Sequence, residues 1–192
     1  IKNGNMGFYD ADRNIVDINL CLQMSFKLNL FYQEFRKNLP PIKLGSVRLR
    51  VSPEGKNGIW LDFANLDVKN LLEEKNWLTA LLKYADVEIG QKRKVLGFKD
   101  GQLKLLDPSP KKWFETYDGD GNAISLFTSI GAFTQTGFAA NKKLVSTVLE
   151  IVKQTKLTSW TEIFCGSGNF TLAIASLGHQ VVAAENDELA IA

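Results

Sequence analysis

The chain has 192 residues, of which 45% are hydrophobic and 23% are charged, an ordinary composition for a protein with one or two buried cores. The formal net charge of +2 is too small to indicate nucleic-acid binding by itself, so any RNA contact has to come from a local patch. Two cysteines and one histidine exclude a disulfide framework and a histidine-based metal cluster. No apolar run is long enough to span a membrane, and a cytoplasmic location is the default expectation.

The first part of the chain shows helix, hairpin and short-strand patterns. Helical spacing predicts a helix over about 21–38, which ends before two prolines. Alternation over 46–64 predicts a hairpin, and an amphipathic helix follows with Asp67 as its N-cap. Five short strand-like pieces then lie between Gly, Asp and Pro residues, which predicts an antiparallel meander. We therefore expect an α+β module over residues 1–130.

The pattern changes over residues 131–192. The segments NKKLVSTVLEIVKQT and NFTLAIASLG have the spacing of helices, and each is followed by a strand-like segment, WTEIF and QVVAAE. This alternation predicts a parallel sheet and the first part of a Rossmann-like domain. The expected fold class of the whole chain is α/β.

The segment EIFCGSGNFTLAIA, residues 162–175, carries the main functional signal. Gly166 and Gly168 lie between a strand and a helix, where they permit a tight turn and let a ligand approach the main chain closely. Glu185 follows about twenty residues later, at the end of the next expected strand. A Rossmann-like site places a carboxylate there to bind ribose hydroxyls.

Different ligands fit such a turn. A dinucleotide site usually has a third glycine, in G-x-G-x-x-G, but this chain has Thr171 at that position. Glu162 precedes the first glycine by four residues, and acid-x-x-x-G-x-G is the pattern of S-adenosylmethionine-dependent methyltransferases. An NAD-dependent oxidoreductase is therefore disfavoured, while a glycine-rich turn in some other α/β domain stays open.

Three strings together resemble the RNA (uracil-5-)-methyltransferase family, which forms 5-methyluridine in transfer or ribosomal RNA. They are FCGSGNFTLAIA, the upstream FTQTGFAANKKLV and the downstream VVAAE. The Asn-Phe pair after the second glycine is more specific to this family than the general methyltransferase pattern. MGFYDADRNIVDINLC is similar to the opening of the family's central domain, so the resemblance covers nearly the whole chain.

The resemblance implies a class I domain that binds S-adenosyl-L-methionine and transfers its methyl group to carbon 5 of a uridine. The implied cofactor-binding residues are Gln135, Phe164, Gly166, Gly168, Asn169 and Glu185. The family usually has Asn two residues after the Gln, whereas this chain has Gly137. Because this polar side chain is missing, the motif does not settle the contacts with the target base or the subgroup of the family.

Cys21 has two interpretations. In family members that act on ribosomal RNA, a cysteine after IVD is the last of four ligands of an iron–sulfur cluster. Cys21 is then a ligand of a [4Fe–4S] cluster whose other cysteines precede Ile1, or it is a small buried side chain. Both interpretations stay open. Cys165 lies in the glycine-rich segment and is expected to serve in packing.

A two-strand parallel fragment would leave apolar faces of the sheet uncovered, so we expect the chain to be part of a longer protein. The family mechanism needs a cysteine nucleophile and a carboxylate base, which are expected beyond Ala192, so we expect no catalytic residue in this chain and no activity from it alone. The expected partners are RNA and the methyl donor, without a membrane, and the protein is expected to be a monomer. The alternative is a non-catalytic RNA-binding homologue of the same fold.

Overall fold

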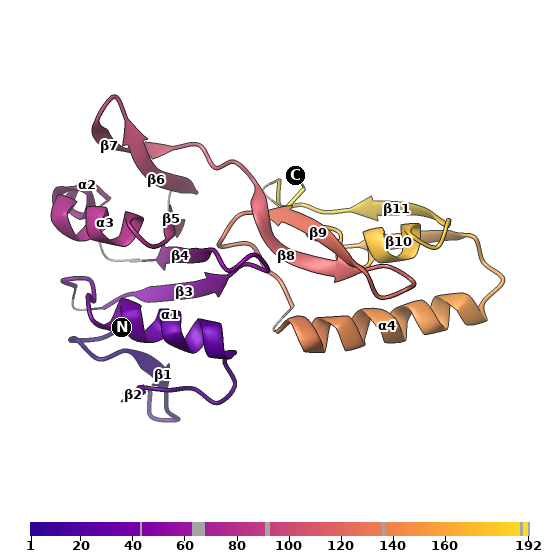
Figure 1. The fold of residues 1–192 in the computed structure, drawn as a ribbon, viewed down its shortest axis with the longest axis horizontal. Coiled ribbons are helices and arrows are strands. Elements are labelled where there is room, and N and C mark those ends of the chain that lie inside the picture. The colour runs from indigo at the N-terminus through magenta and orange to yellow at the C-terminus, as the bar shows by residue number, and fades with distance from the viewer. Residues whose placement is uncertain (43, 63–67, 91–92, 136, 189, 192) are drawn as a thin grey trace. The chain divides into compact units, whose positions relative to one another are not determined.

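The structure is a computed structural model that describes residues 1–42, 44–62, 68–90, 93–135, 137–188 and 190–191. The chain forms two compact units, Ile1–Pro108 and Ser109–Ala192, and each is described by itself (Figure 1). Helices and strands are mixed in both, which confirms the expected α/β class. None of the helices in the described part of the chain is long and apolar enough to cross a membrane.

The first unit contains a five-stranded sheet in the order β3-β4-β5-β6-β7 and a separate antiparallel pair, β1 with β2. Its strands are β1 (Gly7–Tyr9), β2 (Ile15–Asp17), β3 (Ser46–Val51), β4 (Asn57–Asp62), β5 (Asp86–Ile89), β6 (Lys94–Lys99) and β7 (Gln102–Leu106). Its helices are α1 (Phe26–Arg36), α2 (Val68–Glu73) and α3 (Lys75–Leu82). The predicted β3–β4 hairpin is confirmed.

The helices differ in detail from their prediction. The first begins at Phe26, later than predicted, because the Ser25 hydroxyl caps it by accepting a hydrogen bond from the Leu28 N–H at 3.3 Å. The amphipathic helix predicted after the hairpin consists of two helices, α2 and α3, which are separated at Glu74. Its predicted N-cap, Asp67, lies outside the described residues.

The expected antiparallel meander is only partly confirmed. Strands β5, β6 and β7 pair antiparallel in succession, as predicted. Strand β4, which belongs to the preceding predicted hairpin, pairs with β5 in parallel. A parallel pair needs a crossover connection, and the chain between these two strands contains α2 and α3. The last two predicted strands, β8 and β9, form a separate sheet in the second unit.

The core of the first unit lies between this sheet and its helices. One face of the sheet contributes alternate strand residues, as the period of two requires, and α1 and α3 contribute one apolar face each. The fully buried side chains include Phe35, Ile59, Leu61, Leu78, Leu81 and Val87.

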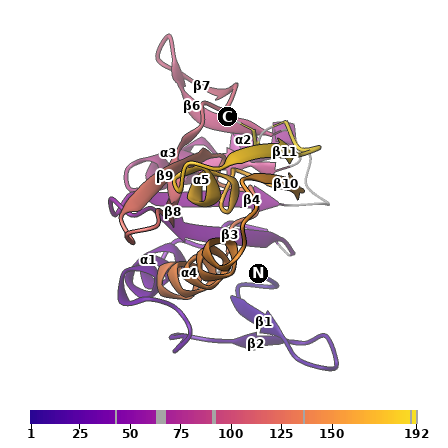
Figure 2. The same cartoon turned by 90° about the vertical axis from the view of Figure 1, so that its right-hand side faces the viewer.

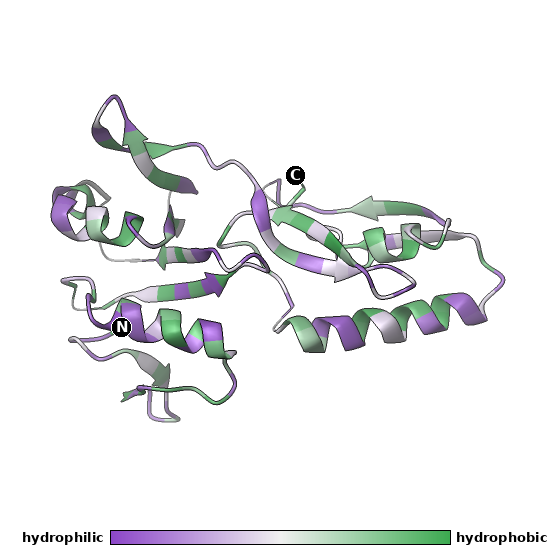
Figure 3. Cartoon of the chain, in the orientation of Figure 1, coloured by the Kyte–Doolittle hydropathy of each residue, from purple (hydrophilic) through white to green (hydrophobic). Residues whose placement is uncertain are grey.

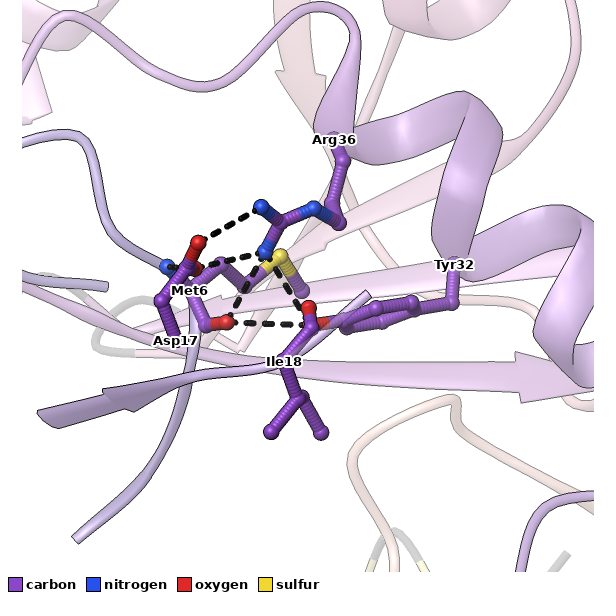
Figure 4. Close-up of polar contacts among 5 residues, drawn as sticks. All are labelled: Met6, Asp17, Ile18, Tyr32 and Arg36. Carbon is purple, nitrogen blue, oxygen red and sulfur yellow. Dashed lines mark hydrogen bonds and ion pairs between the residues drawn. The ribbon is translucent and has the colours of Figure 1, made fainter. Parts of the chain in front are cut away.

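An ion pair connects the β1–β2 hairpin with α1 (Figure 4). The Arg36 guanidinium donates to both carboxylate oxygens of Asp17, at 2.7 and 2.9 Å. The Tyr32 hydroxyl donates to the carbonyl oxygens of Ile18 at 2.7 Å and Met6 at 3.0 Å. Such bidentate pairing fixes the orientation of the two side chains as well as their distance, so it holds the hairpin in one position on α1.

The second unit contains the antiparallel pair β8 with β9 and the parallel pair β10 with β11. Its elements are β8 (Lys111–Tyr117), β9 (Ala123–Thr128), α4 (Phe138–Gln154), β10 (Ser159–Ile163), α5 (Thr171–Ala175) and β11 (Gln180–Ala184). The predicted β-α-β alternation is therefore present, and α5 lies against the β10–β11 pair (Figure 2).

The two units divide at Pro108 and Ser109, whereas the sequence suggested modules of 1–130 and 131–192. The reason is that β8 packs against α4 and α5, so the β8–β9 hairpin has its partners in the second unit. Hydrophobic residues recur along α4 (Figure 3), and its buried stripe meets Tyr117 of β8 and the apolar side of α5. The buried apolar members of this core are Tyr117, Val145, Leu149, Val152, Ala173 and Ile174.

Candidate functional site

The candidate site is the turn between β10 and α5, residues 164–169, which we call the glycine turn. Phe164, Gly166 and Gly168 have positive φ values of 60°, 56° and 87°. Glycine adopts this region at no steric cost, whereas other residues do so rarely. The Cys165 N–H donates to the Ala184 carbonyl at 3.1 Å, so the turn begins directly at the end of the parallel strand pair. The predicted sharp turn between strand and helix is present.

Glu185 faces the glycine turn. One of its carboxylate oxygens accepts a hydrogen bond from the Gly166 N–H at 2.7 Å. The other accepts from the N–H groups of Asn186 at 2.7 Å and Asp187 at 3.0 Å. The amides of Asp187, Gly166 and Asn186 stabilise the anion and lower the pKa of Glu185 below its ordinary value. An ionised carboxylate therefore lies at the tip of β11, beside the turn.

Glu162 lies near the end of β10, two residues before the glycine turn. Its carboxylate accepts a hydrogen bond from the Thr171 hydroxyl at the start of α5. Burial raises the pKa of Glu162, and its hydrogen bonds with Thr171 act in the opposite direction. The acid of the acid-x-x-x-G-x-G pattern thus holds the first residue of α5 to the end of β10.

Asn169 is held by residues outside the turn. Its side-chain amide pairs reciprocally with that of Asn141 on α4, with both N···O distances 2.9 Å. The Asn141 amide also donates to the Glu115 carbonyl at 3.1 Å. The Thr116 hydroxyl donates to the Asn169 carbonyl at 2.5 Å. Both ends of Asn169 are therefore anchored, one to α4 and the other to β8.

The surface of the turn has features that suit a small polar ligand with an apolar part. Phe164 is 76% exposed, so its ring is accessible to a ligand. A Cβ atom placed on Gly166 would have no neighbour within 4 Å, so the space in front of its backbone is open. The Ser167 hydroxyl is buried without a hydrogen-bond partner in the part of the chain that the structure describes. An orphaned buried hydroxyl is the type of group that a bound ligand satisfies.

Gln135 and Gly137 lie on the approach to α4. Gln135 is half-buried, and no hydrogen bond joins it to the glycine turn among the described residues. Gly137 caps α4 with a φ of 77°, a conformation that an Asn at this position would adopt less readily than glycine. The cofactor contact of Gln135 therefore stays a prediction.

The two cysteines differ in their surroundings. Asn29 holds the main chain at Cys21, because its side chain accepts from the Cys21 N–H at 3.0 Å and donates to the Cys21 carbonyl at 2.9 Å. Within the described ranges, no group of three His, Cys, Asp or Glu side chains is placed to hold a metal ion. The described surroundings of Cys21 thus do not supply the four thiolates of an iron–sulfur cluster. Burial, with Glu162 and Glu185 nearby, raises the pKa of the Cys165 thiol.

Sequence reasoning singled out neither Asn141 nor Thr116, both of which are fully buried. A signal for Asn141 does exist. Asn141 is a polar residue at helical spacing with Val145, Leu149 and Val152, the buried stripe of α4. A polar residue on such a stripe needs a hydrogen-bond partner, which here is Asn169.

Comparisons with known proteins relate the chain to RNA methyltransferases. Residues 115–192 match the sequence model of the family described as tRNA (Uracil-5-)-methyltransferase. An uncharacterized RNA methyltransferase of Bdellovibrio bacteriovorus is 40% identical over 192 residues, which are 100% of this chain and 49% of that protein. A 23S rRNA (uracil(1939)-C(5))-methyltransferase of Shewanella halifaxensis is 26% identical over 96% of this chain and 40% of its own length.

A solved structure has a similar fold. The tRNA (uracil-54, C5)-methyltransferase of Pyrococcus abyssi, in complex with S-adenosyl-L-homocysteine, matches with a TM-score of 0.55 and 16% identity, over 100% of this chain and 48% of that one. The resemblance seen in the sequence is confirmed by these matches. The chain spans about half the length, or less, of the proteins it matches over its whole extent.

Proposed function

We propose that this chain forms the donor-binding part of an S-adenosylmethionine-dependent RNA (uracil-5-)-methyltransferase, which methylates carbon 5 of a uridine in transfer or ribosomal RNA. The observation that carries the proposal is the placement of the Glu185 carboxylate against the Gly166 N–H. The matches to RNA uracil-C5-methyltransferases support it.

In this proposal, Glu185 binds the ribose hydroxyls of the donor. Its carboxylate has about four lone-pair sites, and three backbone N–H groups engage it, so about one site is left for the first hydroxyl. The second hydroxyl has to share an oxygen with a backbone N–H or take the place of one. The lowered pKa of Glu185 keeps it ionised at neutral pH, as an acceptor of two vicinal hydroxyls has to be. The exposed Phe164 ring offers an apolar wall, and Gly166 lets the ligand approach the main chain.

The remaining proposed contacts come from Gly168, Asn169 and Gln135. Gly168 completes the turn, and Asn169 fixes its end through the Asn141 pair. Gln135 has an amide able to bind a polar edge of the donor. S-adenosylmethionine supplies the methyl group on its sulfonium when bound.

Carbon 5 of uracil is a poor nucleophile, and covalent addition of a thiolate at carbon 6 overcomes this in the family mechanism. The target uridine has to leave its stack for that chemistry. Cys165 does not suit the role, because its thiol has a raised pKa and the thiolate is the reactive form. We assign no catalytic residue to this chain. RNA is the proposed macromolecular partner, and the cytoplasmic location and monomeric state stay predictions.

The test is methyl transfer by the full-length protein. RNA that contains uridine is incubated with radiolabelled S-adenosylmethionine, digested to nucleosides and separated. We expect label in 5-methyluridine, and a large loss of label for Glu185→Ala. RNA binding without methylation would indicate the non-catalytic homologue instead. Binding of NAD in place of S-adenosylmethionine would indicate an oxidoreductase and contradict the proposal.

A further inference from the structure

Asn141 is the only fully buried polar residue on the apolar stripe of α4 within the described residues. Its side chain is 0% exposed and lies 28 residues from Asn169 along the chain. Burying an amide is unfavourable unless its hydrogen bonds are made, and an apolar side chain would fill this core position at no such cost. The groups that this amide binds therefore have to account for its place in the core.

Those groups lie at the end of the glycine turn. Asn141 and Asn169 exchange two hydrogen bonds through their amides, each 2.9 Å, and this arrangement fixes both planes. The second hydrogen of the Asn141 amide goes to the Glu115 carbonyl of β8. Asn169 directly follows Gly168, whose φ of 87° makes the turn. The pair thus connects a rigid helix and a strand with the backbone of the turn.

We propose that Asn141 is a positioning residue of the methyl-donor site, acting through Asn169 to hold the glycine turn in its binding conformation. The inference rests on the proposed function. A turn built from glycines has many alternative conformations, and ordering it only when the donor arrives would cost affinity. The Asn141–Asn169 pair removes that freedom before binding. In this arrangement the Asn169 side chain is mainly engaged by Asn141, and it serves the donor through the position of its backbone.

The test measures binding of S-adenosylhomocysteine to the full-length protein by titration calorimetry. We expect Asn141→Ala to raise the dissociation constant about tenfold, the equivalent of one or two lost hydrogen bonds. Asn141→Leu fills the same space without an amide. We expect it to restore packing but to bind as weakly as Asn141→Ala. Val152→Ala is the matched control, because Val152 is also buried on the stripe of α4 but lies about three helical turns beyond Asn141. Its dissociation constant should stay within about twofold of wild type.

A double-mutant cycle separates positioning from general loss of stability. If Asn141 acts through Asn169, then Asn141→Ala adds little to the loss caused by Asn169→Ala. Hydrogen exchange of the donor-free protein gives an independent readout. Amides of the glycine turn should exchange faster in Asn141→Leu than in wild type, while those in the middle of α4 do not.

Two negative results have different meanings. If the wild-type protein does not bind S-adenosylhomocysteine, the proposed function fails. If wild type binds it and a folded Asn141→Leu protein binds it equally well, with unchanged exchange in the turn, the positioning role of Asn141 is overturned.

Discussion

The carboxylate of Glu185 accepts a hydrogen bond from the backbone N–H of Gly166, at 2.7 Å. The two residues meet because β10 and β11 are parallel neighbours, so their carboxyl ends lie at the same edge of the sheet. Ligands of open α/β sheets bind at this edge. This hydrogen bond therefore links the carboxylate at the end of β11 with the open glycine turn at the end of β10.

The two glycines of the turn should be sensitive to a side chain. Gly168→Ala places a Cβ at a φ of 87° and 3.4 Å from the Leu172 side chain. Gly166→Ala has open space, but its φ of 56° is strained for alanine. We expect each change to cost about 1 kcal/mol of stability and to weaken binding of S-adenosylhomocysteine. Thermal unfolding and calorimetry of the full-length variants measure the two effects.

Gly178→Ala is the matched control for these variants. Gly178 follows α5 with a φ of 83°, and a Cβ there would also have no neighbour within 4 Å. The backbone strain is similar, but the residue lies outside the glycine turn. Gly178→Ala should lower the unfolding temperature and leave donor affinity unchanged. Equal affinity losses in all three variants would mean that the turn has no special part in binding.

The Asp17–Arg36 pair should make the stability of the first unit depend on pH in acid. The Arg36 side chain and the Met6 N–H lower the pKa of Asp17 from 3.8 to about 2. A depressed carboxyl pKa stabilises the folded state above the unfolded pKa, and this contribution is lost as the pH falls through about 2. Because the Asp17 side chain is 38% exposed, we expect at most about 1 kcal/mol.

Urea unfolding of wild type and Asp17→Asn, followed from pH 7 to pH 2, checks this. The difference in unfolding free energy should be present at neutral pH and shrink between about pH 4 and pH 2. Glu34→Gln, which removes the exposed Glu34–Lys37 pair, should have little effect at any pH. A difference between wild type and Asp17→Asn that stays constant down to pH 2 would contradict the assignment.

Cys165 should be a slow thiol at neutral pH. Its burial and the nearby carboxylates raise its pKa, and alkylation requires the thiolate. We expect iodoacetamide to label Cys165 more slowly at pH 7 than a free cysteine in a peptide, with a rate that rises as the pH increases. Mass spectrometry of the labelled peptide, with Cys165→Ser as the blank, measures the rate. Labelling at the rate of the free thiol would exclude the raised pKa.

The sequence predicted the parts of the site that depend on local rules. Gly166 and Gly168 follow a strand and precede a helix, which predicts the turn. Glu185 is the acid that follows the next strand, which predicts its place in the site. These signals can be read from a short stretch of sequence. The strands and helix of a β-α-β unit pack in a fixed order and hand, so their positions along the chain predict their positions in the fold. That order places Glu185 at the same edge of the sheet as the turn, and the structure adds the hydrogen bond between them.

Other features depended on contacts that a single sequence does not reveal. The parallel pairing of β4 with β5 was missed, because short strands between turn residues look alike in a meander and in a mixed sheet. The β8–β9 hairpin looked like a continuation of the same meander, although its packing partners are α4 and α5. Asn141 was overlooked for a related reason, since its partner Asn169 lies 28 residues away in sequence.

The most direct measurement is calorimetric titration of S-adenosylhomocysteine into the full-length protein and into Glu185→Ala, with Glu188→Ala as a control that removes an exposed acid three residues further on. We expect wild type and Glu188→Ala to bind alike and Glu185→Ala to bind at least about tenfold more weakly, because hydrogen bonds to a charged acceptor are lost. Equal affinity for all three proteins would show that the carboxylate beside Gly166 does not hold the donor, and the proposed site would be wrong.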